Sequence, residues 1–164
     1  MSSHGHDGVV IRRAVDADLP ALGRLGALLL RTHYTFDERR FMAPGSHPEQ
    51  GYAWFLGTQL RDPDVAVFVA DHYGEVTGYV YAGIEPQSWK ELREEAGFIH
   101  DVVVDERDRG HGIATRLMEA AMAWLKERGM PRVLLWTAHP NVAAQRLFSK
   151  LGFRPTMIEM TREL

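Results

Sequence analysis

The feature that most constrains this chain is an apolar stretch that runs into a glycine-containing turn and then into an amphipathic helix. Residues 98–104 read Phe-Ile-His-Asp-Val-Val-Val, and five of the seven are apolar, which favours a largely buried strand over a helix. Gly110 and Gly112 lack a Cβ, so the backbone can turn sharply there and its N–H groups can approach an anion. Apolar residues between 113 and 125 recur at helical spacing, and the start of such a helix carries partial positive charge. The segment therefore predicts a site that grips a pyrophosphate.

Two other phosphate-binding motifs can be compared with the same glycines. A P-loop requires Lys and then Ser or Thr directly after its last glycine, and here Ile113 and Ala114 stand in those places. The dinucleotide fingerprint requires a third glycine, and Thr115 occupies its position. Neither motif accounts for this loop.

The pattern Arg107-x-x-Gly110-x-Gly112 resembles the Gln/Arg-x-x-Gly-x-Gly/Ala motif of the GCN5-related N-acetyltransferase (GNAT) family. The strand before the motif, the helix after it, the next strand and the terminal helix are similar as well, most strongly over residues 98–153. The resemblance implies acetyl-CoA as co-substrate and an amine as acceptor. It also implies that residues 107–112 wrap the pyrophosphate, while the backbones of Val102 and Val104 pair with the pantetheine amides.

The resemblance extends to the last predicted helix. Asn141 at its start is similar to the Asn that touches the cofactor in many relatives, although an Asn there can instead cap the helix. The residues expected to contact the coenzyme are Val102, Val103, Val104, Arg107, Asp108, Arg109, Gly110, His111, Gly112, Ile113, Ala114, Thr115, Asn141 and Phe148.

At two positions the chain departs from the family's commoner pattern. Many relatives carry a Tyr seven residues after the Asn, which protonates the leaving thiolate, but here that residue is Phe148, which cannot donate a proton. Relatives that modify protein N-termini often carry a Glu base five residues before the Asn, where this chain has Trp136. The tyrosines that could replace the missing acid are Tyr34, Tyr79 and Tyr81.

Acetylation of an amine requires a proton acceptor, because an alkyl ammonium of pKa about 10 is not a nucleophile near neutral pH. His100 and Asp101 lie on the central strand, where relatives often carry acidic residues. Alternation along a strand sends two consecutive side chains to opposite faces, so we expect only one of them to point into a given pocket. We favour His100 because neutral imidazole titrates near working pH; for either residue, a structural hydrogen bond is the alternative role.

Length and composition indicate the number of domains and the expected cellular location. With 164 residues the chain is long enough for one domain with a core, which we place at residues 9–164 after a disordered tail at 1–8. No apolar run reaches the length of a membrane span, and the polar start lacks the features of a signal peptide, so we expect a cytoplasmic protein without membrane contact. His4 with a free amino terminus could chelate copper or nickel, but a plain tail is the favoured interpretation, and no metal is expected in the fold.

Charge and cysteine content exclude several function classes. The chain has no cysteine, which excludes an acyl-cysteine intermediate. A net charge of −3 argues against broad electrostatic binding of nucleic acid, and we expect no such partner. An anionic cofactor must therefore be held by local donors.

The order of predicted elements indicates an α/β fold, in which a mixed central sheet of six to seven strands carries helices on both faces. The predicted strands span residues 9–13, 65–71, 76–84, 98–104, 132–137 and 153–161. The predicted helices span residues 17–32 with Asp16 as N-cap, 49–60, about 113–128 and 141–151. Residues 33–48 are expected to form a loop or broken helix over a pocket.

We expect substrate selection to reside in residues 33–48, in the charged insertion 85–95 and near His139, with a small amine as the favoured acceptor. Three functions remain open: an N-acetyltransferase working by direct transfer, a non-catalytic acyl-CoA-binding module, and an enzyme acting on a protein N-terminus or charged tRNA. The resemblance also implies a homodimer as one assembly. An aromatic subsite could come from Trp54, Trp89 and Trp136, for which a core or interface role is the alternative.

Overall fold

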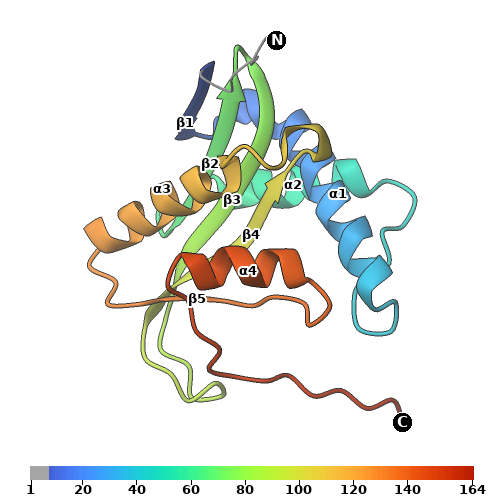
Figure 1. Cartoon of the computed structure of the whole chain (residues 1–164), viewed down its shortest axis with the longest axis vertical. Coiled ribbons are helices and arrows are strands. Elements are labelled where there is room, and N and C mark those ends of the chain that lie inside the picture. Colours follow the sequence, from blue (N-terminus) through green and yellow to red (C-terminus); the bar gives the residue numbers. More distant parts are fainter. Residues whose placement is uncertain (1–7) are drawn as a thin grey trace.

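The computed structural model describes residues 8–164, in which one mixed sheet lies between helices (Figure 1). The strands of the described residues are β1 (Val9–Arg13), β2 (Val65–His72), β3 (Glu75–Glu85), β4 (Ala96–Val104) and β5 (Val133–Leu135). They lie side by side in chain order. The first three pairings are antiparallel, and β4 pairs with β5 in parallel. The predicted α/β class with a mixed sheet is confirmed.

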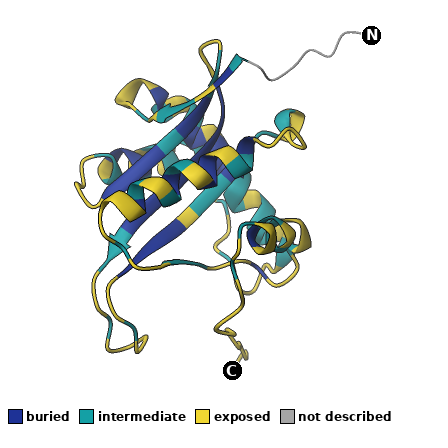
Figure 2. Ribbon diagram, turned by 60° about the vertical axis from the view of Figure 1, so that its left-hand side comes forward, coloured by how far each residue is buried: buried dark blue, intermediate teal, exposed yellow. Residues whose placement is uncertain are grey.

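Helices cover both faces of this sheet. The helices of the described residues are α1 (Leu19–Phe36), α2 (Pro48–Gln59), α3 (Ile113–Glu127) and α4 (Val142–Lys150). On one face, Leu22, Leu25 and Leu56 of α1 and α2 pack against β2 and β3. On the other face, Leu117 and Leu125 of α3 pack against β3 and β4. Because both faces are covered, the central strands are buried along most of their length, as Figure 2 shows in dark blue.

Local sequence signals explain most of these elements. The turn between β2 and β3 uses Tyr73 and Gly74 at positive φ, which closes the predicted hairpin. Asp16 is not the N-cap of α1, because it lies in a short 3-10 turn (Asp16–Asp18) that precedes the helix, and Asp18 occupies the cap position. The helix also continues to Phe36, four residues beyond the predicted end.

The predicted strand at 153–161 is wrong, and the sheet therefore has five strands in the described part of the chain rather than six or seven. Residues 154–164 contain neither helix nor strand and run out from the body after α4 (Figure 1). A strand requires a neighbour that satisfies its backbone groups, and this segment does not lie along β5.

Two further expectations concern the first residues of the chain and its relation to membranes. Of the predicted tail at 1–8, residues 1–7 lie outside the described residues, and so does the hypothesis of a metal at His4. Among residues 8–164, no helix has the length and apolar character that crossing a membrane requires.

Candidate active site

The loop before α3 has the backbone that its glycines predict. Gly110 and Gly112 adopt φ angles of 82° and 76°, in the left-handed region that favours glycine. No atom lies within 4 Å of the position that a Cβ would take at either residue, so the space in front of the loop is open. Helix α3 begins at Ile113, directly after Gly112. The first N–H groups of a helix have no partner within it, and here they face this open loop as donors for an anion.

Both arginines of the loop interact with other residues of the chain. The Arg107 guanidinium lies 3.2 Å from Glu75 and 3.5 Å from Asp105, and its side chain is 72% exposed. Arg109 donates from Nε to the Val104 carbonyl at 3.1 Å, which ties the loop to the end of β4. Since two carboxylates already neutralise Arg107, backbone N–H groups are the main donors that the loop offers to a phosphate.

Strands β4 and β5 are joined over only part of their length. The parallel pairing covers Gly97, Phe98 and Ile99 of β4, although β4 continues to Val104. Beyond Ile99, the described residues place no strand on this edge of β4. The backbone groups of Val102 and Val104 are therefore on an edge that an extended ligand can join as an additional strand.

The pairing of β3 with β4 is irregular at His100. Tyr81 lies opposite Asp101 while Ala82 lies opposite Ile99, so His100 is the extra residue of a β-bulge. The expectation that His100 and Asp101 point to opposite faces is wrong, because a bulge interrupts the alternation. His100 contacts Tyr81 and Asp101 contacts Tyr79, and these two tyrosines, two residues apart on β3, share one face.

His100 is held between aromatic rings and a carboxylate. Its ring stacks on Phe98 with centroids 5.6 Å apart and lies 4.7 Å from the ring of Tyr81. Its Nε2 is 3.0 Å from Oε1 of Glu85, at the end of β3. The imidazole is thus oriented while its side chain remains 29% exposed.

Asp101 lies in a more enclosed environment than its neighbour. Tyr52 of α2 and Tyr79 of β3 both donate hydrogen bonds to Oδ2 of Asp101, at 2.6 Å and 2.9 Å. Burial raises the pKa of Asp101, an effect that the two tyrosine hydrogen bonds partly offset. Burial and the nearby carboxylate likewise raise the pKa of Tyr52 and Tyr79. This arrangement stabilises the packing of α2 on the sheet.

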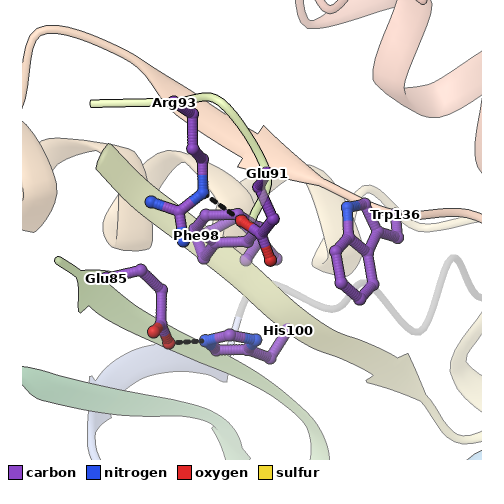
Figure 3. A pocket seen from close by; sticks show the side chains of 7 residues that line it. Glu85, Glu91, Arg93, Phe98, His100 and Trp136 are labelled. Carbon is purple, nitrogen blue, oxygen red and sulfur yellow. Dashed lines mark hydrogen bonds and ion pairs between the residues drawn. The ribbon is translucent and has the colours of Figure 1, made fainter. Parts of the chain in front are cut away.

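A pocket of about 220 Å³ lies beside His100 (Figure 3). Trp136, the residue after β5, forms one wall with its indole, which is 75% exposed and meets Phe98 edge to face at 6.2 Å. The residues that line it are Glu85, Glu91, Arg93, Phe98, Ile99, His100 and Trp136. They come from the end of β3, from the first half of β4, from the residue after β5 and from the insertion 85–95, part of the region expected to select the acceptor. Arg93 pairs with Glu91 and lies over the Phe98 ring at 4.9 Å, so the pocket already contains a cation. The carboxylate of Glu85 and the indole of Trp136 are the groups that remain for a cationic acceptor.

The remaining candidate residues have the following contacts. Asn141 accepts a hydrogen bond from the Ala144 backbone N–H at 3.2 Å and so caps α4, while its contact with the coenzyme stays a prediction. Phe148 is 7% exposed and packs on Phe153. Burial raises the pKa of Tyr81 to about 12, and its hydroxyl donates to Gln59. Tyr34 does not line the pocket beside His100.

Two residues of the site were missed by the sequence analysis. Glu85 was assigned to the insertion, and only the register of β3 on β4 shows that it faces His100. Tyr52 lies on α2, far from Asp101 in the chain, and no local pattern indicates that contact.

Comparison with known proteins decides the family. The model of the acetyltransferase (GNAT) family matches residues 29–153. The chain belongs to this family. The prediction from the glycine motif is thus confirmed at the level of the family.

Relatives with curated names are acetyltransferases. The chain is 31% identical over 156 residues to a mycothiol acetyltransferase of Thermobispora bispora, a match that covers 87% of this chain and 52% of the relative. It is 32% identical over 117 residues to an N-alpha-acetyltransferase of Sulfurisphaera tokodaii, covering 68% and 70% of the two chains. The chain thus spans about half the length of the mycothiol enzyme.

A solved structure supports the same fold. Aminoglycoside N-acetyltransferase AAC(6′)-Iy, determined in complex with CoA, superposes with a TM-score of 0.76 over 100% of this chain and 99% of its own, at 20% identity. At this level of identity the likeness concerns the fold alone.

Proposed function

We propose that the chain transfers an acetyl group from acetyl-CoA to a primary amine, with a small molecule as the acceptor. The observation that carries this proposal is the left-handed glycine turn at the start of α3, next to the open edge of β4. The turn offers N–H donors to the pyrophosphate, and the edge offers backbone groups to the pantetheine amides. AAC(6′)-Iy, which shares the fold, was solved with CoA.

His100 is the proposed general base. A carboxylate at Glu85 favours the tautomer with the proton on Nε2, which leaves the lone pair of Nδ1 available for the proton of the amine. Figure 3 shows the second ring nitrogen facing away from Glu85, within the pocket that Trp136 borders. Asp101 is less suited to this role, because its carboxylate already accepts two hydrogen bonds.

The proposed reaction is a single transfer in a ternary complex. The amine nitrogen attacks the thioester carbonyl carbon, a C–N bond forms, and the C–S bond breaks. The amine proton passes to His100, and CoA leaves as the thiolate. A thiol with a pKa of roughly 8.5 is a fair leaving group, so water can protonate it and the buried Phe148 need not take part.

The pocket supports a small cationic acceptor. Glu85 supplies negative charge, since Glu91 is paired with Arg93, and the indole of Trp136 offers an aromatic face. The N-alpha-acetyltransferase relative supports a protein N-terminus as a second candidate acceptor. Acetyl-CoA and the amine are the proposed partners.

The test is release of the CoA thiol by the purified protein with acetyl-CoA and separate sets of polyamines, aminoglycosides, amino thiols and peptides with free N-termini. Turnover with a small amine supports the proposal, and turnover confined to peptides would replace it by the second candidate. Binding of acetyl-CoA without turnover of any acceptor would favour the non-catalytic module, for which the absence of an acid at Phe148 is the specific observation.

A further inference from the structure

The acceptor pocket contains a guanidinium group that the proposed reaction does not use. Arg93 lines the pocket together with His100, and its side chain is only 16% exposed. Its backbone exchanges hydrogen bonds with Ser88 at 2.9 and 3.1 Å, which folds the loop between β3 and β4 back on itself. Charged side chains are rarely buried to this extent unless they have partners. The contacts of Arg93 therefore indicate which of its groups are left for a ligand.

The loop fixes the guanidinium through two of its three nitrogens. Nε of Arg93 donates to the carboxylate of Glu91, and Nη1 donates to the carbonyls of Pro86 and Glu94 at 2.8 and 3.2 Å. The group also lies over the ring of Phe98, with its central carbon 4.9 Å from the ring centroid. The position of the guanidinium is thus set by the protein itself, and a ligand that binds it does not have to order a free side chain.

The third nitrogen, Nη2, has no hydrogen bond or ion pair with any residue in the part of the chain that the structure describes. Figure 3 shows one terminal nitrogen of the guanidinium on the side of the pocket where Glu85 and His100 lie. A guanidinium nitrogen can only donate hydrogen bonds. Nη2 of Arg93 therefore offers two N–H groups to an oxygen atom of a ligand in this pocket.

The charges around His100 have both signs. The carboxylate of Glu85 lies 3.0 Å from its imidazole, and Phe98, which carries the guanidinium of Arg93 on its ring, stacks with the same imidazole. A polyamine would place a second ammonium group beside the guanidinium, where like charges repel each other. An acceptor with one ammonium and one carboxylate group would instead match both charges of the pocket.

We propose that the acceptor is a small amino acid, whose carboxylate binds Nη2 of Arg93 while its amine lies at His100. Hydrogen bonds between guanidinium and carboxylate groups are charge-assisted and strong, and Glu85 attracts the ammonium form of the amine. The pocket volume of about 220 Å³ is below the roughly 300–1,000 Å³ that drug-sized ligands occupy, so it suits a molecule of this size. This assignment rests on the proposed function, because it names the acceptor of the same site, and it makes Arg93 the residue that selects it.

Binding measured with and without the carboxylate tests the proposal. Phenylalanine and phenethylamine differ only in this group, as do alanine and ethylamine. Each is titrated calorimetrically at neutral pH into the protein with CoA, which has no acetyl group to transfer. We expect each amino acid to bind about 10- to 100-fold more tightly than its amine, the size of a hydrogen bond between charged groups. Equal binding, tighter binding of the amines, or no binding of either amino acid would overturn the proposal.

Two variants locate the group that binds the carboxylate. Arg93→Gln removes the cation and should abolish the preference for the amino acids. Glu91→Gln breaks the same ion pair but keeps the guanidinium, so it should keep the preference. Equal loss in both variants would point to a disturbed loop, and a preference that survives Arg93→Gln would place the carboxylate elsewhere. Either result overturns the proposal.

Release of the CoA thiol from acetyl-CoA separates this proposal from the proposed function. We expect the amino acids to be acetylated faster than their amines. An amino acid that binds through Arg93 without being acetylated would contradict the proposed function and leave the amino acid site in place. Acetylation of phenylalanine and phenethylamine with equal efficiency would support the proposed function and overturn the role of Arg93.

Discussion

The coenzyme loop and the acceptor pocket are built in different ways. The loop at 107–115 is one continuous segment, and its chemistry comes from backbone N–H groups exposed by two glycines and a helix start. The pocket is made of side chains from β3, from β4, from the residue after β5 and from an insertion. A backbone site of this kind can be predicted from a short stretch of sequence, whereas a side-chain site depends on register and on bulges.

The largest expected effect lies in the pocket. His100→Ala should lower the acetylation rate about 100-fold, which is the lower end of the usual contribution of a general base. The loss should shrink as pH rises toward the amine pKa of about 10, where the amine no longer needs a base. Steady-state rates across a pH series check this, with Glu119→Ala, an exposed position on α3, as control. Equal rates for His100→Ala and wild type at every pH would remove His100 from the mechanism.

The loop should respond to a backbone change almost as strongly. Gly112→Val forces a β-branched residue into the left-handed region and turns the N–H groups away, which should weaken acetyl-CoA binding by about 30- to 100-fold. Gly129→Val is the matched control, because Gly129 also has positive φ and open space around its Cβ position but lies after α3. Calorimetry should show a loss confined to Gly112→Val. Equal losses in both variants would point to general strain.

The buried carboxylate of Asp101 should affect the stability of the fold. Burial raises its native pKa, so in the pH range between its ordinary and native values the native state binds more protons than the unfolded state. The unfolding free energy should therefore fall as pH rises through this range. Asp101→Asn should remove that part of the pH dependence in urea titrations. An unchanged pH profile would contradict the effect of burial on Asp101.

The smallest effect is expected from a charged side chain of the loop. Arg107 is exposed and already paired with Glu75 and Asp105, so Arg107→Ala should weaken acetyl-CoA binding by only about threefold, the size of an exposed charge contact. Arg107→Gln serves as a neutral variant of similar length. A loss as large as that of Gly112→Val would show that this side chain, and not the backbone, binds the phosphates.

Particular residues show which features could be predicted from the sequence alone. The strand, turn and helix around Gly110 and Gly112 were predicted correctly because each depends on neighbours in the chain. The orientation of His100 was wrong, since a bulge in β4 cannot be seen from alternation. Glu85 and Tyr52 were missed because their contacts arise only when β3 and α2 pack against β4.

The segment at 153–161 illustrates a different limit. Its composition favours a strand, and within one copy it has no strand to join. Propensity describes what a segment can form, and pairing decides whether it forms.

The measurement that tests the central claim most directly is calorimetric titration of the wild-type protein with acetyl-CoA and, separately, with 3′-phosphorylated ADP, which lacks the pantetheine arm. We expect acetyl-CoA to bind with Kd on the order of micromolar and the nucleotide at least about tenfold more weakly, because it cannot pair with the open edge of β4. Absence of acetyl-CoA binding would contradict the assignment of the glycine loop and of the β4 edge.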